Sequence, residues 1–381
     1  MNIRKVDDKL FWAVQTLSQQ KKWECILHAN DFNRTKILLK KNDIEILDEY
    51  LFIKAFKVVL NKKQLTYLSR TTQIKFISSL SKASALMDVA KNILGVDECN
   101  LTGKGQCVAF IDTGLRQHCD FCLGGNRLEV FKDFVNGKSC CYDDNGHGTF
   151  VAGVCSGSGA LSAGKYSGVA PKSKIISLKA LDGQGEASAD KILNAMEWVY
   201  DNHKKYNLKV VCMSFGSEPL GLNDPIMSGA ESLWQEVITV VAAAGNSGPE
   251  YQTIKSPGVS SRIITVGGFN DNRIEGNVEE RFFEMAQFSS RGPAFKRFKP
   301  DLVAPAVDIT SCGKTKAYNL LSGTSVATPM IAGMCLLLLE QNKNLTPNEI
   351  KRILLSSCKP ICFNRNLEGY GYPNMNRIYR R

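Results

Sequence analysis

Short, continuously apolar runs alternate with helical patterns after residue 100, and this alternation is the strongest constraint on the fold. The apolar runs are Gln106–Ile111, Ile175–Ala180, Lys209–Ser214, Val237–Ala243 and Ile263–Val266. The helical patterns are His147–Cys155, Ala189–Asn202, Pro225–Trp234, Ser325–Glu340 and Asn348–Ser357. Strands that are apolar on both faces and separated by helices are typical of a parallel sheet covered on both sides. We therefore predict an α/β fold with a mostly parallel sheet in residues 86–381.

The first part of the chain has a different pattern and contains no glycine. All 31 glycines lie at or after Gly95. Residues 20–80 suggest a strand, a helix, two strands, a helix and a strand, which is the β-α-β-β-α-β order of a ferredoxin-like unit. We therefore predict a small α+β domain at 1–85, followed by the larger domain at 86–381.

Charge and hydropathy restrict the classes of function. The net charge is +11, and the first 96 residues carry 17 basic against 9 acidic side chains. These basic residues are scattered and no recognition motif accompanies them, so we expect no nucleic-acid partner. The apolar runs are shorter than the roughly 20 residues of a membrane span. The N-terminus has no apolar segment typical of a secretory signal. We expect no membrane association and a cytoplasmic location.

The thirteen cysteines are an odd number, and several lie in apolar runs, where a free thiol acts as a small hydrophobe. One histidine and four cysteines gather between residues 118 and 141: His118, Cys119, Cys122, Cys140 and Cys141. The spacing of Cys119 and Cys122 would suit a zinc ion or a redox pair. Unpaired thiols are the favoured interpretation, and a redox role stays an open alternative. We predict no metal site.

Four residues suited to catalysis each stand at the end of a predicted strand or the start of a predicted helix. Asp112 ends one strand and Asn246 follows another, while His147 and Ser325 each begin a helix. Each alone would serve as a cap or turn residue. Together they comprise a nucleophile, a base, an orienting acid and an amide donor, at positions where open α/β sheets place their sites. The order Asp, His, Ser differs from that of the α/β-hydrolases.

The segments around these residues resemble the motifs of the subtilisin-like serine proteases. They are Ile111-Asp-Thr-Gly114, Gly146-His-Gly-Thr149, Ala243-Ala-Gly-Asn246 and Gly323-Thr-Ser-Val-Ala-Thr-Pro329, with Gly168-Val-Ala-Pro171, Met213-Ser-Phe-Gly216 and Lys299-Pro-Asp-Leu-Val-Ala-Pro305 in addition. The resemblance covers about residues 100–358. Residues 20–82 resemble the inhibitory propeptide of that family in topology. Within the family, the chain is most similar to the intracellular AprX-type and clostridial germination subtilases.

The resemblance implies a serine endopeptidase that works through an acyl-enzyme and is made as a self-processing zymogen. Ser325 would attack the peptide carbonyl, His147 would take and return the proton, and Asp112 would orient His147. Asn246 would donate to the oxyanion. Self-cleavage is expected within Leu80–Asp88. A dedicated processing protease for one precursor and a pseudoprotease scaffold are the alternatives.

The resemblance also implies that a protein or peptide substrate binds as an extended strand. One edge of the binding site would contain Gly183 and Gly185, and the other edge would contain Ser214, Phe215 and Gly216. Residues Ala242, Ala243, Ala244 and Gly245 would line the first specificity pocket. Its floor is expected in the segment Ser247–Ser256, where Glu250 and Lys255 leave the charge preference open. No Asn-rich calcium loop follows His147, so we expect no cofactor, although many subtilases bind calcium.

Overall fold

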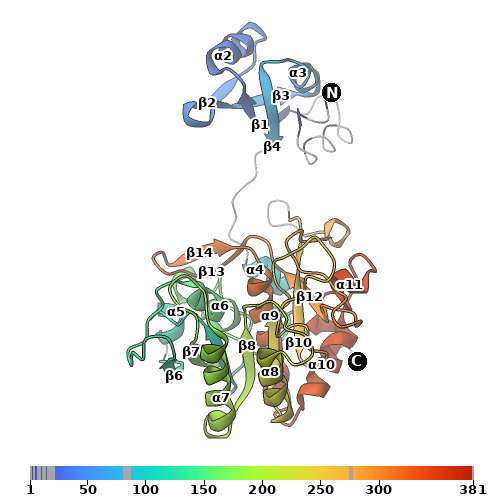
Figure 1. The fold of residues 1–381 in the computed structure, drawn as a ribbon. Coiled ribbons are helices and arrows are strands. Elements are labelled where there is room, and N and C mark those ends of the chain that lie inside the picture. The colour runs from blue at the N-terminus through green and yellow to red at the C-terminus, as the bar shows by residue number, and fades with distance from the viewer. Residues whose placement is uncertain are drawn as a thin grey trace. The chain divides into compact units, whose positions relative to one another are not determined.

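The computed structural model describes residues 22–79, 87–123, 125–273 and 278–379, together with positions 2, 5, 6, 10 and 14. The chain divides into two compact units, residues 1–83 and 84–381 (Figure 1). The sequence predicts this division after residue 85.

The N-terminal unit is an antiparallel sheet with two helices. Its elements are β1 (Lys22–Ala29), α2 (Phe32–Lys41), β2 (Ile46–Tyr50), the short 3-10 helix η2 (Leu51–Ile53), β3 (Ala55–Asn61), α3 (Lys62–Leu68) and β4 (Ile74–Ser79). The strands lie in the order β2-β3-β1-β4, and all three neighbouring pairs are antiparallel. The described residues thus have the β-α-β-β-α-β order that the sequence predicts for this segment.

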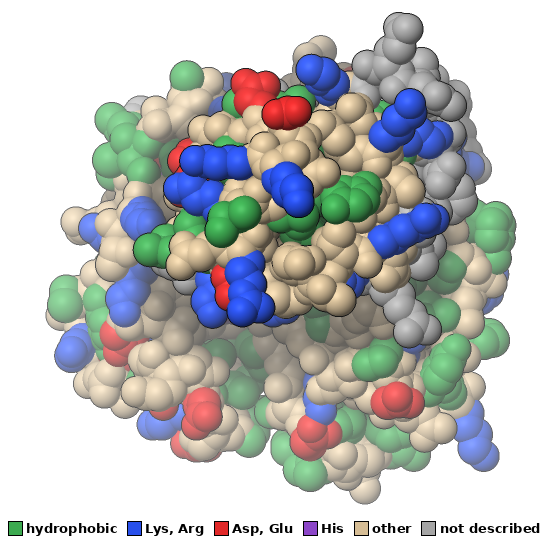
Figure 2. All heavy atoms as spheres, turned by 90° about the horizontal axis from the view of Figure 1, so that it is seen from above, with side chains coloured by type: hydrophobic (Ala, Val, Ile, Leu, Met, Phe, Trp, Pro, Cys, Tyr) green, Lys and Arg blue, Asp and Glu red, His purple; other side chains and the backbone are tan. Residues whose placement is uncertain are grey.

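Local signals in the sequence explain where the helices of this unit begin. The Asp31 side chain accepts a hydrogen bond from the Arg34 backbone N–H, and Asn61 forms a reciprocal capping box with Gln64. The unit has its own buried apolar cluster, which includes Leu27 and Phe56. Lys and Arg side chains lie scattered, singly and in small groups, over the near face in Figure 2.

The second unit contains a mostly parallel sheet with the strand order β11-β10-β9-β8-β5-β7-β6, and β12 also pairs with β10. The bounds are β5 (Cys107–Asp112), β6 (Leu128–Asp133), β7 (Lys174–Lys179), β8 (Leu208–Met213), β9 (Thr239–Ala243), β10 (Ile264–Asn270), β11 (Glu284–Met285) and β12 (Leu302–Pro305). Only the β10–β11 pair is antiparallel among these described strands. The predicted α/β fold is confirmed.

Helices cover both faces of this sheet. On one face α6 (His147–Ser156) packs against α9 (Thr324–Gln341), and on the other α7 (Ala189–Tyr206) packs against α8 (Pro225–Gln235) (Figure 1). The remaining described elements are α4 (Met87–Ile93), α5 (Cys119–Cys122), α10 (Pro347–Ser357), α11 (Arg365–Glu368), α12 (Met375–Tyr379), the 3-10 turns η3 (Ala160–Ser162) and η4 (Glu280–Phe282), and the hairpin β13 (Ile309–Cys312) and β14 (Tyr318–Leu321).

Helix α9 is apolar around its whole circumference. Among the described helices it alone is long and apolar enough to cross a membrane, but 83% of the tested window is buried inside the protein. An all-apolar helix that is buried in this way is typical of the centre of a large core.

The parallel arrangement brings several polar residues to one edge of the sheet. Neighbouring strands β7, β5, β8 and β9 run in the same direction, so their carboxyl ends lie side by side. Asp112 ends β5, Lys179 ends β7 and Ser214 directly follows β8. Asn246 lies three residues beyond the end of β9. The candidate catalytic residues that follow strands are therefore assembled at this edge.

Candidate active site

Asp112 and His147 form a hydrogen-bonded pair at this edge, with 2.8 Å between Asp112 Oδ1 and His147 Nδ1. Asp112 is buried, and its Oδ1 also accepts the backbone N–H of Thr113. The His147 side chain is 26% exposed, so it is reachable from solvent. Because Nδ1–H donates to the carboxylate, the lone pair of the neutral ring is on Nε2.

The environment of His147 changes its pKa. Burial by itself lowers the pKa, but the charge of Asp112 and its hydrogen bond outweigh this effect and raise the pKa above the ordinary value. A raised pKa means that the site stabilises the imidazolium form. This is the form that a general base reaches after it takes a proton.

A close approach of α6 to β5 fixes the position of His147. A side chain at Gly148 would collide with the Gly114 carbonyl oxygen and would lie 3.2 Å from Asp112 Cβ. The Gly148 backbone N–H donates to Thr113 Oγ1 at 2.8 Å. Only glycine therefore lets the first turn of α6 lie against the end of β5.

Ser325 Oγ and Asn246 Nδ2 both lie close to Gly323, which precedes α9. A β-carbon built on Gly323 would lie 3.2 Å from Ser325 Oγ and 3.3 Å from Asn246 Nδ2. Asn246 Oδ1 accepts hydrogen bonds from the Thr324 backbone N–H (2.9 Å) and from Thr324 Oγ1 (3.0 Å). The amide oxygen of Asn246 thus caps α9, and its Nδ2 is turned toward the side where Ser325 Oγ lies.

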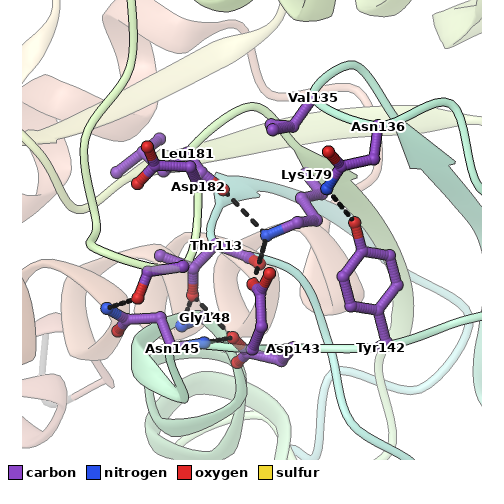
Figure 3. Close-up of polar contacts among 12 residues, drawn as sticks. Thr113, Val135, Asn136, Tyr142, Asp143, Asn145, Gly148, Lys179, Leu181 and Asp182 are labelled. Atoms are coloured by element: carbon purple, nitrogen blue, oxygen red, sulfur yellow. Dashed lines mark hydrogen bonds and ion pairs between the residues drawn. The ribbon is translucent and has the colours of Figure 1, made fainter.

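Asp143 organises the loop that leads to His147 (Figure 3). Its Oδ1 accepts hydrogen bonds from Thr113 Oγ1 and from the Gly146 backbone N–H, and its Oδ2 accepts the hydroxyl and backbone N–H of Thr149. Burial by itself raises the pKa of Asp143, but the hydrogen bonds from Thr149, Gly146 and Thr113 outweigh burial and hold the pKa below its ordinary value. The ionised carboxylate therefore ties β5, the loop and α6 together.

Lys179 joins the same loop to the segment after β7. Its Nζ donates to the carbonyl oxygens of Thr113 (2.6 Å) and Leu181 (2.9 Å) and pairs with Asp144 Oδ1 (2.7 Å), as Figure 3 shows in part. Its side chain is fully buried and lies 5.0 Å from the centre of the Tyr142 ring. The carbonyl and carboxylate acceptors, which lie on three segments of the chain, satisfy the buried ammonium group of Lys179.

Hydrogen bonds also hold the predicted substrate edge near His147. Asn145 Nδ2 donates to the Gly183 carbonyl oxygen at 3.1 Å, and Asn145 Oδ1 accepts a hydrogen bond from the His147 backbone N–H. A side chain on Gly185 would lie 3.4 Å from Asn145 Nδ2. Gly183 and Gly185 are therefore placed beside the loop of the candidate base.

The residues predicted to bind the substrate differ in how far they are exposed to solvent. The side chains of Ala242 and Ala244 pack into buried apolar clusters, Ala243 is 2% exposed, and Gly245 is buried. Any contact of these alanines with substrate would come from their backbone. On the facing segment Ser214 is buried, Phe215 is half-buried and Gly216 is exposed.

The side chains that the structure brings together as potential metal ligands are not the cysteines that the sequence suggests. Among the described residues, the group with suitable geometry is His118, Asp120 and Cys312, whose ligand atoms lie within 4.8 Å of one another. Cys312 belongs to β13, nearly 200 positions along the chain, so sequence spacing gave no signal for it. Cys119, Cys122, Cys140 and Cys141 are not members of this group.

The carboxylate of Asp120 is already occupied by hydrogen-bond donors. It accepts the Gly159 backbone N–H at 2.9 Å, the Tyr318 hydroxyl at 3.0 Å and the Cys312 thiol at 3.7 Å. His118 Nδ1 accepts the Asp120 backbone N–H. Calcium requires oxygen lone pairs, whereas these oxygens face hydrogens, so the group does not fit calcium.

Sequence reasoning missed two residues of this region, Asp143 and Lys179. The run Tyr142-Asp-Asp-Asn-Gly146 before a helix is a signal for a capping carboxylate, which could have indicated Asp143. Lys179 is the one charged residue in the apolar run Ile175–Ala180. A lysine inside a buried strand indicates that hydrogen-bond acceptors for its ammonium group are buried nearby.

Comparison with known proteins identifies the class. Residues 103–379 match the model of the subtilase family, and the chain belongs to this family of subtilisin-like serine proteases. Serine protease AprX of Bacillus subtilis (strain 168) is 36% identical, and the alignment covers 93% of this chain and 91% of that protein. M-protease of Shouchella clausii is 30% identical over 87% of this chain and 81% of its own length. The resemblance inferred from the motifs is confirmed.

Solved structures with the same fold agree with this assignment. Sphericase matches with a TM-score of 0.66 and 26% identity, covering 76% of this chain and 99% of that chain. A cold adapted subtilisin-like serine proteinase matches with a TM-score of 0.57 and 30% identity, covering 72% and 89%.

Proposed function

We propose that this protease hydrolyses internal peptide bonds through Asp112, His147 and Ser325, with a covalent acyl-enzyme intermediate. The observation that carries the proposal is the 2.8 Å hydrogen bond between the buried Asp112 and His147. It lies at the sheet edge where Asn246 also emerges, and α6 packs against α9, the helix that Ser325 begins. Family membership alone would not require an intact catalytic set in this chain.

The mechanism follows from the orientation of these groups. Ser325 Oγ attacks the peptide carbonyl carbon while His147 Nε2 takes its proton. His147 then gives this proton to the leaving amine, and the C–N bond breaks to leave an ester on Ser325. A water molecule, deprotonated by His147, attacks the ester and releases the acid and the free serine. Asp112 orients the His147 ring and stabilises its imidazolium form throughout.

The oxyanion of each tetrahedral intermediate needs donors that are fixed in advance. Asn246 Nδ2 is such a donor, because Thr324 holds the other end of the amide. The amino end of α9 adds the positive end of its helix dipole. These groups support Ser325 as the nucleophile rather than as a helix cap.

A fluorophosphonate probe is the direct test of this proposal. The probe should phosphonylate Ser325 Oγ with loss of fluoride, and peptide mapping by mass spectrometry should find the adduct on that residue. His147→Ala should abolish labelling because it removes the base. His203→Ala, at a half-buried position in the last turn of α7, is the matched control and should label normally. Failure of the wild-type protein to label at Ser325 would contradict the assignment.

We further propose that residues 1–85 form a propeptide that is removed by self-cleavage and then inhibits the enzyme. The N-terminal unit has its own apolar cluster and its own capped helices, which supports independent folding. Of the expected cleavage segment Leu80–Asp88, residues 80–86 lie outside the described residues.

Mass spectrometry of the purified protein tests self-processing. Wild-type protein should appear as two fragments, and the isolated N-terminal fragment, added back, should reduce hydrolysis of peptides. A wild-type chain that remains uncut while fully active would contradict the zymogen proposal.

We also propose a cytoplasmic location. The twelve cysteines other than Cys25 have free thiols in the structure, and free thiols are typical of a reducing compartment. Alkylation of intact cells followed by mass spectrometry would test whether these thiols are reduced in place.

A further inference from the structure

Lys255 lies between the two segments that are expected to bind the substrate. A β-carbon on Gly216 would lie 2.6 Å from Lys255 Cβ, and one on Gly245 would lie 2.5 Å from Lys255 Cγ. The stem of the lysine thus fills the space beside both glycines. Gly216 belongs to the segment after β8, and Gly245 immediately precedes Asn246, the proposed oxyanion donor.

Backbone hydrogen bonds fix Lys255 in this position. Its N–H donates to the Ala244 carbonyl oxygen at 2.9 Å. The next residue, Ser256, exchanges two hydrogen bonds of 2.9 Å with Ser217. Buried Ser256 also donates from its hydroxyl to Asp224 Oδ1 at 2.8 Å. The chain at Lys255 therefore connects both substrate segments, and it holds Lys255 Cβ beside them.

The charged end of Lys255 has a partner that a substrate can replace. Its side chain is 17% exposed, and Nζ forms an ion pair with Glu218, whose side chain is 80% exposed. An ion pair with so exposed a carboxylate is weak, because water solvates the carboxylate and salt screens the pair. A carboxylate that arrives on a bound substrate would find the ammonium group oriented and partly desolvated, so it would compete effectively with Glu218.

We propose that Lys255 makes this protease prefer a substrate with an acidic side chain on the residue whose carbonyl is attacked. This inference rests on the proposed function. In that function the carbonyl lies between Ser325 and Asn246, so the side chain of the same residue extends along Gly245 toward Lys255. Glutamate or aspartate at this position pairs with Nζ, and Glu218 is the resident counter-ion that the substrate displaces. Lys255 is thus a specificity residue.

Matched peptides test this proposal. Three peptides that differ only at the residue before the cleaved bond carry Glu, Gln or Lys, and kcat/KM is measured for each. Wild-type enzyme should cleave the Glu peptide about 10-fold or more faster than the Gln peptide, as expected for a hydrogen-bonded charge pair. Lys should be cleaved least well. The Glu-to-Gln ratio should fall with added salt, because screening weakens exposed charge pairs.

Three variants separate the role of Lys255 from other effects. Lys255→Gln keeps a polar stem but should bring the Glu-to-Gln ratio close to one. Glu218→Gln should raise the ratio because it removes the competing carboxylate. Lys359→Gln, which removes an ion-pairing lysine outside the substrate segments, should leave the ratio unchanged. The Glu-to-Gln ratio compares two peptides on the same variant, so a general loss of folding or activity lowers both kcat/KM values equally and leaves the ratio unchanged.

The possible failures are distinguishable. Enzyme that labels at Ser325 but cleaves the Glu and Gln peptides equally would overturn the specificity proposal alone. A Glu-to-Gln ratio that is as high in Lys255→Gln as in the wild-type enzyme would also overturn it. A protein that neither labels nor cleaves any of the peptides would overturn the proposed function and this inference together.

Discussion

Replacing Ser325 with alanine is expected to lower kcat for peptide hydrolysis by about 10⁶, the size of effect known for loss of the serine in subtilisin itself. In the proposed mechanism Ser325 Oγ is the attacking oxygen. The change removes one half-buried hydroxyl at the start of α9, so the free energy of unfolding should change by about 1 kcal/mol or less. Peptide hydrolysis and chemical denaturation would measure the two effects.

The same variant should also remain a single intact chain if the protein processes itself. Ser322→Ala is the matched control, since Ser322 is an exposed serine three residues earlier whose Oγ accepts the Asp308 backbone N–H. It should keep normal activity and normal processing. Wild-type turnover in Ser325→Ala would refute the nucleophile assignment, whatever the state of the chain.

Replacing Asp112 with asparagine is expected to lower kcat by about 10⁴. The amide would offer an N–H to His147 Nδ1, so the ring would carry its proton on Nε2 and lose the ability to accept one from Ser325. The kcat/KM of the wild-type enzyme should rise with pH through a pKa above about 6.5, because Asp112 raises the pKa of His147. In Asp112→Asn this apparent pKa should move down.

The same shift predicts how stability depends on pH. Since folding raises the pKa of His147, its charged pair with Asp112 contributes fully to the free energy of unfolding below about pH 6.5. This contribution is lost as the pH rises through the raised pKa.

Asp133→Asn is the control for Asp112→Asn, because Asp133 is another buried carboxylate at a strand end that accepts backbone N–H groups. An unchanged kcat in Asp112→Asn would show that Asp112 is structural only.

Periodicity along the chain was sufficient to predict most of the second unit. The central strands are continuously apolar because helices cover both of their faces, and this pattern is visible locally. Edge strand β6 was missed because its residues are mostly half-buried and give no continuous apolar run. Strand β12 was missed because it spans only Leu302–Pro305. In both cases the strand forms because a neighbouring strand supplies its hydrogen bonds.

The candidate catalytic residues were also predictable, although their contacts were not. Asp112, His147, Asn246 and Ser325 each follow a strand or begin a helix, and parallel strands place such positions at one edge. The potential metal ligands that the structure brings together, His118, Asp120 and Cys312, were not predictable because they come from distant segments. Asp120 is satisfied by Gly159, Tyr318 and Cys312, which no spacing rule connects.

Local patterns in the amino-acid sequence predict the order of most elements, the capped helices of the N-terminal unit and the positions of the candidate catalytic residues. These depend on hydropathy period, capping residues and short motifs, which act between neighbours in the chain. The tertiary structure decided that Lys179 is buried against Thr113 and Leu181, and that Lys255 lies between Gly216 and Gly245. A lysine's sequence neighbours do not indicate which acceptors or glycines it will meet. Strand order and the close approach of separate loops fix these partners, and they set the charge of the proposed substrate pocket.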